Sequence, residues 1–158
     1  MDPWLVTTLL VLLVTANGTP LVAGILLGTC CDRPVDNNIR LADQHALLGS
    51  SKTLRGLVVA IVATAVAAAL LGMTWIDGAW FGLLAMLGDL FSSFIKRRLG
   101  FPSGKCAPLL DQLPESVLPV WITQPLTGAG ASEMLSAVAA FIVIDLLLTR
   151  LFKAVTAR

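Results

Sequence analysis

One apolar stretch of the sequence ends in residues that could bind a metal ion and a phosphate together. Asp89, Ser93 and Lys96 follow one another at spacings of four and three residues, and Arg97 comes directly after them. In a helix this spacing places the first three side chains on one face. Asp89 would lie about 10 Å from Lys96 along the axis, inside the membrane if Lys96 marks its edge. Ionisable groups at that depth are costly, so we expect them to have a function.

A second segment that could bind phosphate precedes the apolar run that starts at Gly56. It reads Gly-x-x-Lys-Thr-x-Arg, so it places Lys52, Arg55 and a hydroxyl at the expected N-terminus of a helix. Such a terminus attracts anions through its free N–H groups. The spacing is not that of a Walker phosphate loop. In the alternative interpretation Ser50 or Ser51 caps the helix and the two cations lie at the lipid headgroups.

Four carboxylates are expected near the membrane face that carries these cations. They are Asp36, Asp43, Asp89 and Asp111. They suffice for one or two hard cations such as Mg²⁺, which prefers carboxylates together with substrate phosphates and water. Phosphoryl or nucleotidyl transfer needs metal ions that neutralise phosphates and cations that stabilise departing pyrophosphate. These residues favour such a reaction, and no protein nucleophile is then required.

The elements that must position these residues are membrane helices. Of the 158 residues, 56% are hydrophobic and 13% are charged, and the mean hydropathy is +0.85, as expected for an integral membrane protein. Asp2 stands where a signal peptide would carry Lys or Arg, so we expect the first apolar run to be a retained span. The clear candidate spans are Trp4–Leu27, which Asn17–Pro20 should kink or unwind, Gly56–Ile76, Gly78–Ile95 and Ala131–Leu148.

The basic residues fall into three groups that predict the orientation. They are Arg33, Arg40, Lys52 and Arg55; Lys96, Arg97, Arg98 and Lys105; and Arg150, Lys153 and Arg158. By the positive-inside rule all three groups are cytoplasmic, so an even number of spans separates neighbouring groups and the weak segment Glu115–Thr127 must also cross. We predict an all-α, polytopic membrane helix bundle of one domain, residues 1–158. It has five transmembrane helices, an external N-terminus, a cytoplasmic C-terminus and cytoplasmic loops at about 29–55 and 97–113.

The cysteines and the single histidine add little chemistry. Cys30, Cys31 and Cys106 lack C-x-x-C spacing and a paired histidine cluster, so we interpret them as packing residues rather than zinc ligands or a structural disulfide. His45 could be a general base, but a loop residue without a catalytic role is the favoured interpretation.

Five segments resemble, in order and spacing, the motifs of the CDP-archaeol synthase family. They are residues 16–20, 34–36, 48–56, 87–100 and 110–113, of which the Lys-Arg-Arg and Asp-Gln-Leu segments are specific. The resemblance implies a five-helix bundle that uses Mg²⁺ to transfer CMP from CTP to an unsaturated archaeal ether-lipid phosphate and releases pyrophosphate. The family usually has an acidic residue followed by Gly-Arg-Arg where this chain reads Asp-Gln-His-Ala at 43–46. It also has a glycine where this chain has Asn37-Asn38. The acceptor could therefore also be phosphatidic acid or another polyprenyl or alkyl glycerol phosphate.

From the residues and this resemblance we predict an enzyme that joins CTP and a lipid phosphate at the cytoplasmic face of the cell membrane. The predicted catalytic residues are Asp89, Lys96 and Asp111; the substrate-binding residues are Asn17, Lys52, Thr53, Arg55, Ser93, Arg97 and Arg98; and the Mg²⁺ ligands are Asp89 and Asp111 with Asp36 or Asp43. The expected partners are CTP, the lipid phosphate and the bilayer, and no nucleic acid.

A non-enzymatic membrane protein, either a transporter subunit or an assembly factor, is the alternative. It would use the broken first helix and Asp89 as an ion path. Asp145 in the last span discriminates between the two. The transport interpretation is favoured if Asp145 faces Asp89 across a polar channel. It is not favoured if Asp145 bonds to a neighbouring helix.

Overall fold

The chain forms a bundle of helices joined by two long loops at one end. The computed structural model describes the backbone of residues 1–41 and 43–156 and the side chains of residues 1–41 and 43–150. Within these ranges the helices are α1 (Pro3–Leu27), α2 (Leu54–Leu70), α3 (Trp75–Arg98), α4 (Gln112–Ile122), α5 (Gln124–Thr127) and α6 (Ala131–Thr156). The part of the chain that the structure describes contains no β-strand, only two isolated bridges in the first loop. The side chains of Lys153 and Arg158, from the third basic group, lie outside the described residues.

Three of the helices are long and apolar enough to cross a bilayer: Pro3–Leu27, Trp75–Arg98 and Ala131–Arg150. The prediction of a membrane helix is confirmed for these three segments. Helix α2 is apolar but has 17 residues, and α4 has 11, which corresponds to about 17 Å at the usual rise of an α-helix. The helices alone therefore do not establish five spans.

Two of the predicted spans have different ends in the structure. The run Gly56–Ile76 was expected as one helix, but α2 ends at Leu70 because Gly72 adopts a positive φ of 85°. Thr74 then caps α3 by accepting a hydrogen bond from the backbone N–H of Asp77. The segment Glu115–Thr127 is divided into α4 and α5 at Thr123, where Pro125 begins the short second helix.

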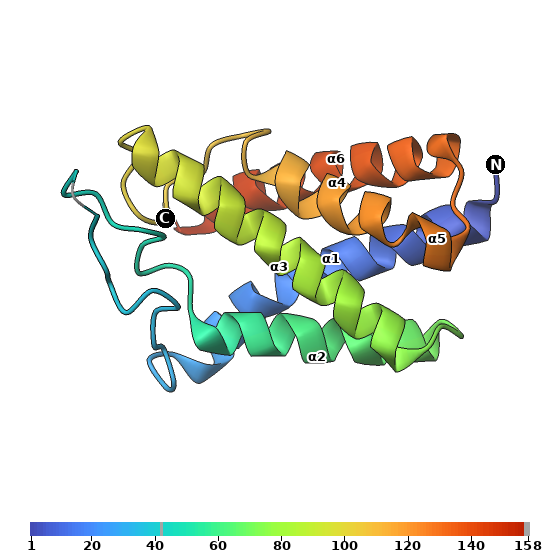
Figure 1. The fold of residues 1–158 in the computed structure, drawn as a ribbon, viewed down its shortest axis with the longest axis horizontal. Helices are drawn as coiled ribbons and strands as arrows, with labels where there is room; N and C mark the ends of the chain where they lie inside the picture. Colours follow the sequence, from blue (N-terminus) through green and yellow to red (C-terminus); the bar gives the residue numbers. More distant parts are fainter. Residues whose placement is uncertain (42, 157–158) are drawn as a thin grey trace.

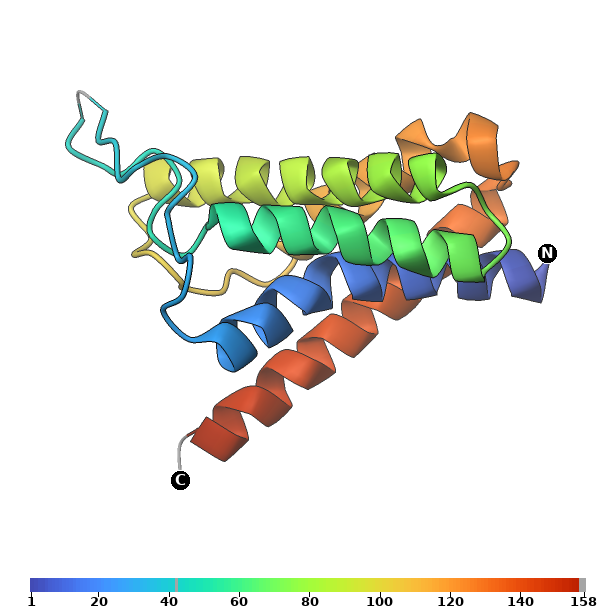
Figure 2. The ribbon, with the colours of Figure 1, turned by 90° about the horizontal axis from the view of Figure 1, so that it is seen from below.

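Of the two outcomes predicted for Asn17–Pro20 in the first helix, a kink or local unwinding, the structure shows a bend without unwinding. Helix α1 remains α-helical through Asn17–Pro20, although Pro20 has no N–H to donate to the carbonyl of Ala16. Figure 2 shows the last turns of α1 turning away from the axis of its earlier turns. The missing backbone bond explains a bend without unwinding, because every other residue of the segment keeps helical geometry.

The long loops and the C-terminal end of α6 gather at one end of the bundle (Figure 1). The loops are residues 28–53 and 99–111, between α1 and α2 and between α3 and α4. At the opposite end lie the N-terminus, the turn between α2 and α3, and α5. The first two basic groups and Arg150 of the third therefore belong to the same end of the bundle.

The buried residues differ between the two ends. The apolar core is built from Leu9, Leu12 and Leu13 of α1 with Phe81 of α3 and Phe141 of α6, in the half remote from the loops. The buried polar side chains of the loop half are Asp36, Ser92, Ser93, Lys96, Arg97, Gln112, Glu115 and Ser116. Hydrophobic packing thus stabilises one half of the bundle, and polar contacts organise the other.

A glycine sets the distance between α3 and α4 in the polar half. A Cβ atom added to Gly88 would lie 2.2 Å from the carbonyl oxygen of Pro114 and 2.7 Å from the Cα of Glu115. Small residues allow membrane helices to approach this closely. Gly88 therefore permits the contact that brings Asp89 of α3 beside the first turn of α4.

We expect Gly88→Ala to destabilise the protein by about 1–3 kcal/mol, because the added methyl group must push α4 away from α3. Thermal unfolding in one detergent measures the loss. Gly18→Ala is the matched control, since Gly18 also lies inside a helix and its added Cβ meets nothing within 4 Å. If Gly88→Ala is as stable as Gly18→Ala, the close approach of the two helices is wrong.

Candidate active site

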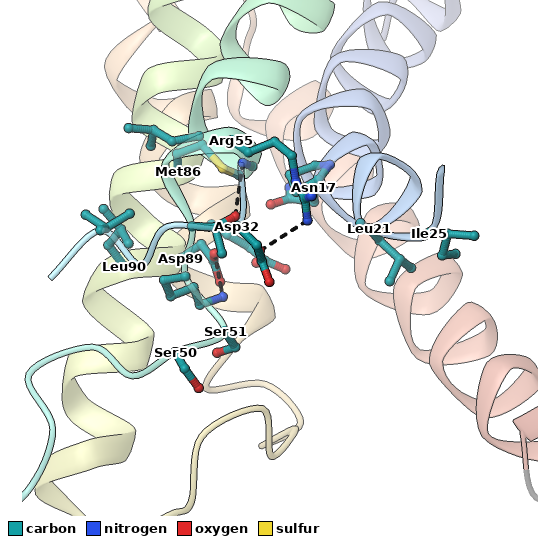
Figure 3. A pocket seen from close by; sticks show the side chains of 18 residues that line it. Asn17, Leu21, Ile25, Asp32, Ser50, Ser51, Arg55, Met86, Asp89 and Leu90 are labelled. Carbon is teal, nitrogen blue, oxygen red and sulfur yellow. Dashed lines mark hydrogen bonds and ion pairs between the residues drawn. The ribbon is translucent and has the colours of Figure 1, made fainter. Parts of the chain in front are cut away.

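A cavity of about 520 Å³ opens among α1, the first loop, α2 and α3. Its polar lining consists of Asn17, Asp32, Ser50, Ser51, Lys52, Thr53, Arg55, Asp89 and Glu115. Figure 3 shows Asn17, Leu21 and Ile25 of α1 on one side of this space, and Arg55, Asp32 and Asp89 on the other. Concave sites with a few convergent charged groups are where small ligands usually bind. The cavity is therefore the candidate active site.

An ion pair between Lys52 and Asp89 forms the centre of the cavity wall. The Nζ atom of Lys52 lies 2.6 Å from each carboxylate oxygen of Asp89, and both side chains are about one-fifth exposed (21% and 20%). The backbone N–H of Val35 donates to the carbonyl of Lys52 at 2.8 Å, and that of Leu54 donates to Arg33 at 2.9 Å. The first loop is thereby held so that Lys52 points at the middle of α3.

A second ion pair, which is more buried than the first, joins the end of α3 to the start of α4. The Nζ atom of Lys96 lies 2.7 Å from Oδ1 of Asp111, and their side chains are only 7% and 15% exposed. Lys96 also donates to the carbonyl of Lys105 at 3.0 Å, while Oδ2 of Asp111 accepts from the N–H of Ala107 at 2.8 Å. The two charged residues thus fix the fold of the loop 99–111 as well as each other.

The two long loops contact each other above these pairs. Oγ of Ser103 accepts a hydrogen bond from the N–H of Ser51 at 3.3 Å and lies 3.4 Å from Oγ of Ser50. Arg97 is buried beneath this contact and donates to the carbonyl of Phe101. The loops therefore form one polar layer over the end of the bundle.

Arg55 and Thr53 have structural partners at the rim of the cavity. Arg55 donates to the carbonyls of Gly28 and Cys30 at 2.8 and 2.6 Å and pairs with Asp32 at 3.2 Å. Thr53 caps α2 by accepting from the N–H of Gly56 at 3.2 Å. The expected cap was Ser50 or Ser51, but the helix starts later, at Leu54, so Thr53 takes that position.

Six predicted site residues carry a buried polar atom without a hydrogen-bond partner, and Asn17 and Ser93 are the uncharged ones among them. Nδ2 of Asn17 donates to the carbonyl of Leu13 at 3.0 Å, but its Oδ1 accepts nothing, and Oγ of Ser93 has no partner. An unsatisfied buried polar atom costs about 1–3 kcal/mol. Asn17 lines the cavity, so its free acceptor is available to a ligand there. Ser93 is buried on α3 and does not line the cavity.

Besides Ser93, the structure does not bring six of the predicted site residues into the lining of the cavity: Asp36, Asp43, Lys96, Arg97, Arg98 and Asp111. Within the described residues no three acids, histidines or cysteines come together as a metal site. Asp43 instead forms an ion pair with Arg98 on the outer side of the first loop. The predicted cluster of four carboxylates is therefore not assembled, because loop contacts hold two of the acids elsewhere.

Asp36 organises the first loop instead of facing the cavity. Its two oxygens accept hydrogen bonds from the backbone N–H groups of Asn38, Leu48 and Gly49 at 2.8 to 3.1 Å. Burial opposes its negative charge, but these N–H groups outweigh that effect and lower the pKa of the Asp36 carboxyl below its ordinary value. The carboxylate thus closes the loop between residues 36 and 49.

Glu115 lines the cavity and was not among the predicted site residues. It is 7% exposed and lies beside Asp89, because the α3–α4 approach at Gly88 reaches its Cα. The sequence analysis treated Glu115 only as an interruption of a weak span. Its position in an apolar segment, one helical turn after Asp111, was the signal that could have found it.

A second cavity of about 490 Å³ lies between α1 and α6 and is mostly apolar. Asn17, Leu21 and Ile25 line both cavities. Asp145 lines only the second one, where its Oδ2 accepts from Nε2 of Gln112 at 2.7 Å. Asp145 therefore bonds to a neighbouring helix, which is the outcome that does not favour a transport path.

Comparisons with known proteins identify similar sequences and one similar structure. The sequence pattern of the family described as CarS-like, CDP-archaeol synthase, matches residues 4–155. The CDP-archaeol synthase of Aeropyrum pernix is 40% identical over 104 residues, which cover 62% of this chain and 56% of the relative. That of Methanopyrus kandleri is 44% identical over 87 residues, which cover 51% and 50%. The chain thus spans about half the length of these curated relatives.

The similar solved structure is that of an intramembrane enzyme for archaeal membrane lipids biosynthesis. It superimposes on this chain with a TM-score of 0.73 at 32% sequence identity. The superposition covers 90% of each of the two chains, so the likeness extends over the loops as well as the helices.

We expect Asp36→Asn to open the first loop, because a neutral amide cannot accept all three backbone hydrogen bonds as strongly. Tryptic cleavage after Arg40 should become roughly 5–30-fold faster, the factor that corresponds to a local loss of 1–2 kcal/mol.

Since the pKa of Asp36 is lowered, the stabilisation of the loop by Asp36 is complete above the ordinary Asp pKa. It is lost as the pH falls through the lowered value. Asp43→Asn, in the same loop but exposed, is the control. Equal cleavage of both variants would contradict the assignment.

Proposed function

The chain belongs to the CDP-archaeol synthase family, and we propose from this that it transfers CMP from CTP to a lipid phosphate. The observation that carries the proposal is the polar cavity inside an apolar bundle, with the Lys52–Asp89 pair in its wall and the Lys96–Asp111 pair at the base of the adjoining loop. Four charged groups in two pairs are costly at such a place unless they act on a charged ligand. A triphosphate is such a ligand.

In the proposed reaction an oxygen of the lipid phosphate attacks the α-phosphorus of CTP. A new P–O bond joins the lipid phosphate to CMP, and the bond between the α-phosphorus and the bridging oxygen to the β-phosphate breaks. Pyrophosphate leaves with the electron pair of that bond. Lys52, Lys96 and Arg97 supply the positive charge that stabilises the departing pyrophosphate. The side-chain oxygen of Asn17 accepts a hydrogen bond from the ligand, because no protein group occupies it.

The chemistry of the two acids fits Mg²⁺. The ammonium of Lys52 lies equally close to both oxygens of Asp89, so both oxygens of this carboxylate already contact a cation. Mg²⁺ usually takes one or two protein carboxylates and completes its shell with phosphates and water, so Asp89 and Asp111 suffice. When bound, the ion would neutralise phosphate charge. Lys52 would contact a phosphate oxygen.

We propose an archaeal-type ether-lipid glycerol phosphate as the acceptor. The names of the relatives and the solved structure, which concern archaeal lipids, support this choice. Phosphatidic acid is the competing acceptor, because this chain differs from the family in its first loop. The apolar second cavity, which shares Asn17 and Leu21 with the first, is the place where lipid chains would meet the site.

We also propose five spans in the cell membrane, with α4 and α5 together as the fourth. The N-terminus is outside and the C-terminus is cytoplasmic. In support, the long loops carry the basic residues at one end, whereas Asp2, Asp77 and Glu133 belong to the other end. The loop 99–111 extends the short α4 toward the cytoplasmic side.

The purified protein in detergent with Mg²⁺ should release pyrophosphate from CTP only when a lipid phosphate is present, and chelation of the metal should stop the reaction. Asp89→Asn should lower kcat at least about a hundredfold, because it removes a charge that the metal and the transition state need. A coupled pyrophosphate assay with the ether-lipid phosphate and with phosphatidic acid measures both effects.

Lys96→Met and Lys105→Met form the matched pair of controls for this assay. Lys96 is buried against Asp111, so its loss should abolish turnover, whereas the exposed Lys105 should be dispensable. No turnover of wild-type protein with either lipid, or near-normal turnover by folded Asp89→Asn protein, would contradict the proposal.

For the topology, a cysteine placed at position 128 should react with a membrane-impermeant thiol reagent from outside the cell, because five spans put α5 at the outer face. Cys30 and Cys31 should be protected in intact cells and react after permeabilisation, and a protein with serines at the three native positions gives the background. Labelling of position 128 from the cytoplasmic side only would remove the fourth span.

A further inference from the structure

Asp145 is a carboxylate in the middle of α6, and the proposed reaction does not use it. It lies in a wall of the apolar second cavity, one turn before the charged end of the last helix. A carboxylate in such surroundings is costly unless it has a specific partner. Its partner is Nε2 of Gln112, the first residue of α4, at 2.7 Å.

Gln112 links Asp145 to the loop before α4. Its side chain is 1% exposed, and both ends of its amide are used: Nε2 donates to Asp145, and Oε1 accepts from the N–H of Leu109 at 2.6 Å. Leu109 has a φ of 65°, which is uncommon for a residue with a side chain. The hydrogen bond that the N–H of Leu109 donates to Gln112 therefore holds a strained turn in place.

The Leu109 turn determines where Asp111 points. The N–H of Asp111 donates to the carbonyl of Ala107 at 3.0 Å, and the N–H of Ala107 donates back to Oδ2 of Asp111 at 2.8 Å. Leu109 lies between these two residues. With the turn closed, Oδ1 of Asp111 faces Lys96 at 2.7 Å.

We propose that Asp145 is a positioning residue that acts through Gln112 and the Leu109 turn to hold the Asp111 carboxylate against Lys96. The effect on turnover rests on the proposed function, whereas the effect on the loop does not. Partners that orient a ligating carboxylate typically change activity or metal affinity 10–100-fold when removed. The same carboxylate also ties the diverging half of α6 to α4 (Figure 2).

The first test measures hydrogen–deuterium exchange of the backbone amides 107–111 in the full-length protein without substrate. Asp145→Leu leaves Nε2 of Gln112 without an acceptor, so we expect exchange at least about tenfold faster there. Asp145→Asn keeps an acceptor oxygen and should stay close to wild type. Glu133→Gln is the matched control, because this second carboxylate of α6 contacts the N–H of Asp2 at the other end of the bundle.

A double variant that exchanges the acid and the amide between positions 112 and 145 separates a positioning role from general damage to the fold. Gln112→Glu places a second carboxylate against Asp145 and should speed exchange of the loop. Adding Asp145→Asn should restore protection, because the new amide can donate to Glu while the other Glu oxygen still accepts from Leu109. Wild-type exchange in Asp145→Leu, or failure of the double variant to recover, would overturn the proposal.

The activity measurement uses the same variants with CTP, Mg²⁺ and lipid phosphate. Asp145→Leu should lower kcat about tenfold or more with the KM for CTP within about twofold, since the cavity residues that contact the nucleotide are unchanged. Glu133→Gln should leave both constants unchanged. A raised KM for CTP with a normal kcat would overturn the positioning role. If wild-type protein does not turn over CTP, the proposed function fails. The hydrogen–deuterium exchange experiment still decides whether Asp145 positions Asp111 through Gln112.

Discussion

The polar half of the bundle depends on the pairing of charges that would otherwise lie alone among apolar helices. Asp89 on α3 and Lys52 in the first loop neutralise each other, and Lys96 and Asp111 do the same between α3 and α4. Removing one partner of a buried pair leaves an uncompensated charge, which is far more costly than losing the attraction itself. The two pairs therefore restrict the loops. Lys52 and Asp111 reach their partners only when the loop backbones adopt particular conformations.

This constraint divides the molecule into a half with an apolar core and a half that holds the candidate site. The remote half packs leucines and phenylalanines in its core. The loop half holds the charged groups in pairs, leaves the side-chain oxygen of Asn17 without a partner and encloses a cavity. A ligand that replaces one member of a pair finds its binding groups already oriented. The apolar half pre-organises the site in this way without contributing a residue to its chemistry.

The apolar runs were sufficient to predict where α1, α3 and α6 lie, because long hydrophobic segments have few alternatives in a membrane protein. Hydropathy failed at the end of α2, where the apolar run continues past Gly72 although the backbone turns there. It also failed for the loops: nothing local to Asp36 shows that three N–H groups will hold it away from the cavity. Likewise, the bond between Asp145 and Gln112 joins residues 33 positions apart, so spacing within one helix could not reveal it.

The order of the paired residues along the chain has a consequence for biogenesis. Lys52 precedes Asp89 by 37 residues, so it has already been synthesised when α3 leaves the ribosome. The acid that lies farther from the loop end can therefore enter the membrane with its counter-ion at hand, as part of the α2–α3 hairpin. Lys96 must wait for Asp111, which follows it in the chain, but it lies at the end of α3 where water can hydrate its ammonium meanwhile. The order of synthesis thus allows both members of the Lys52–Asp89 pair to be present when α3 enters the bilayer.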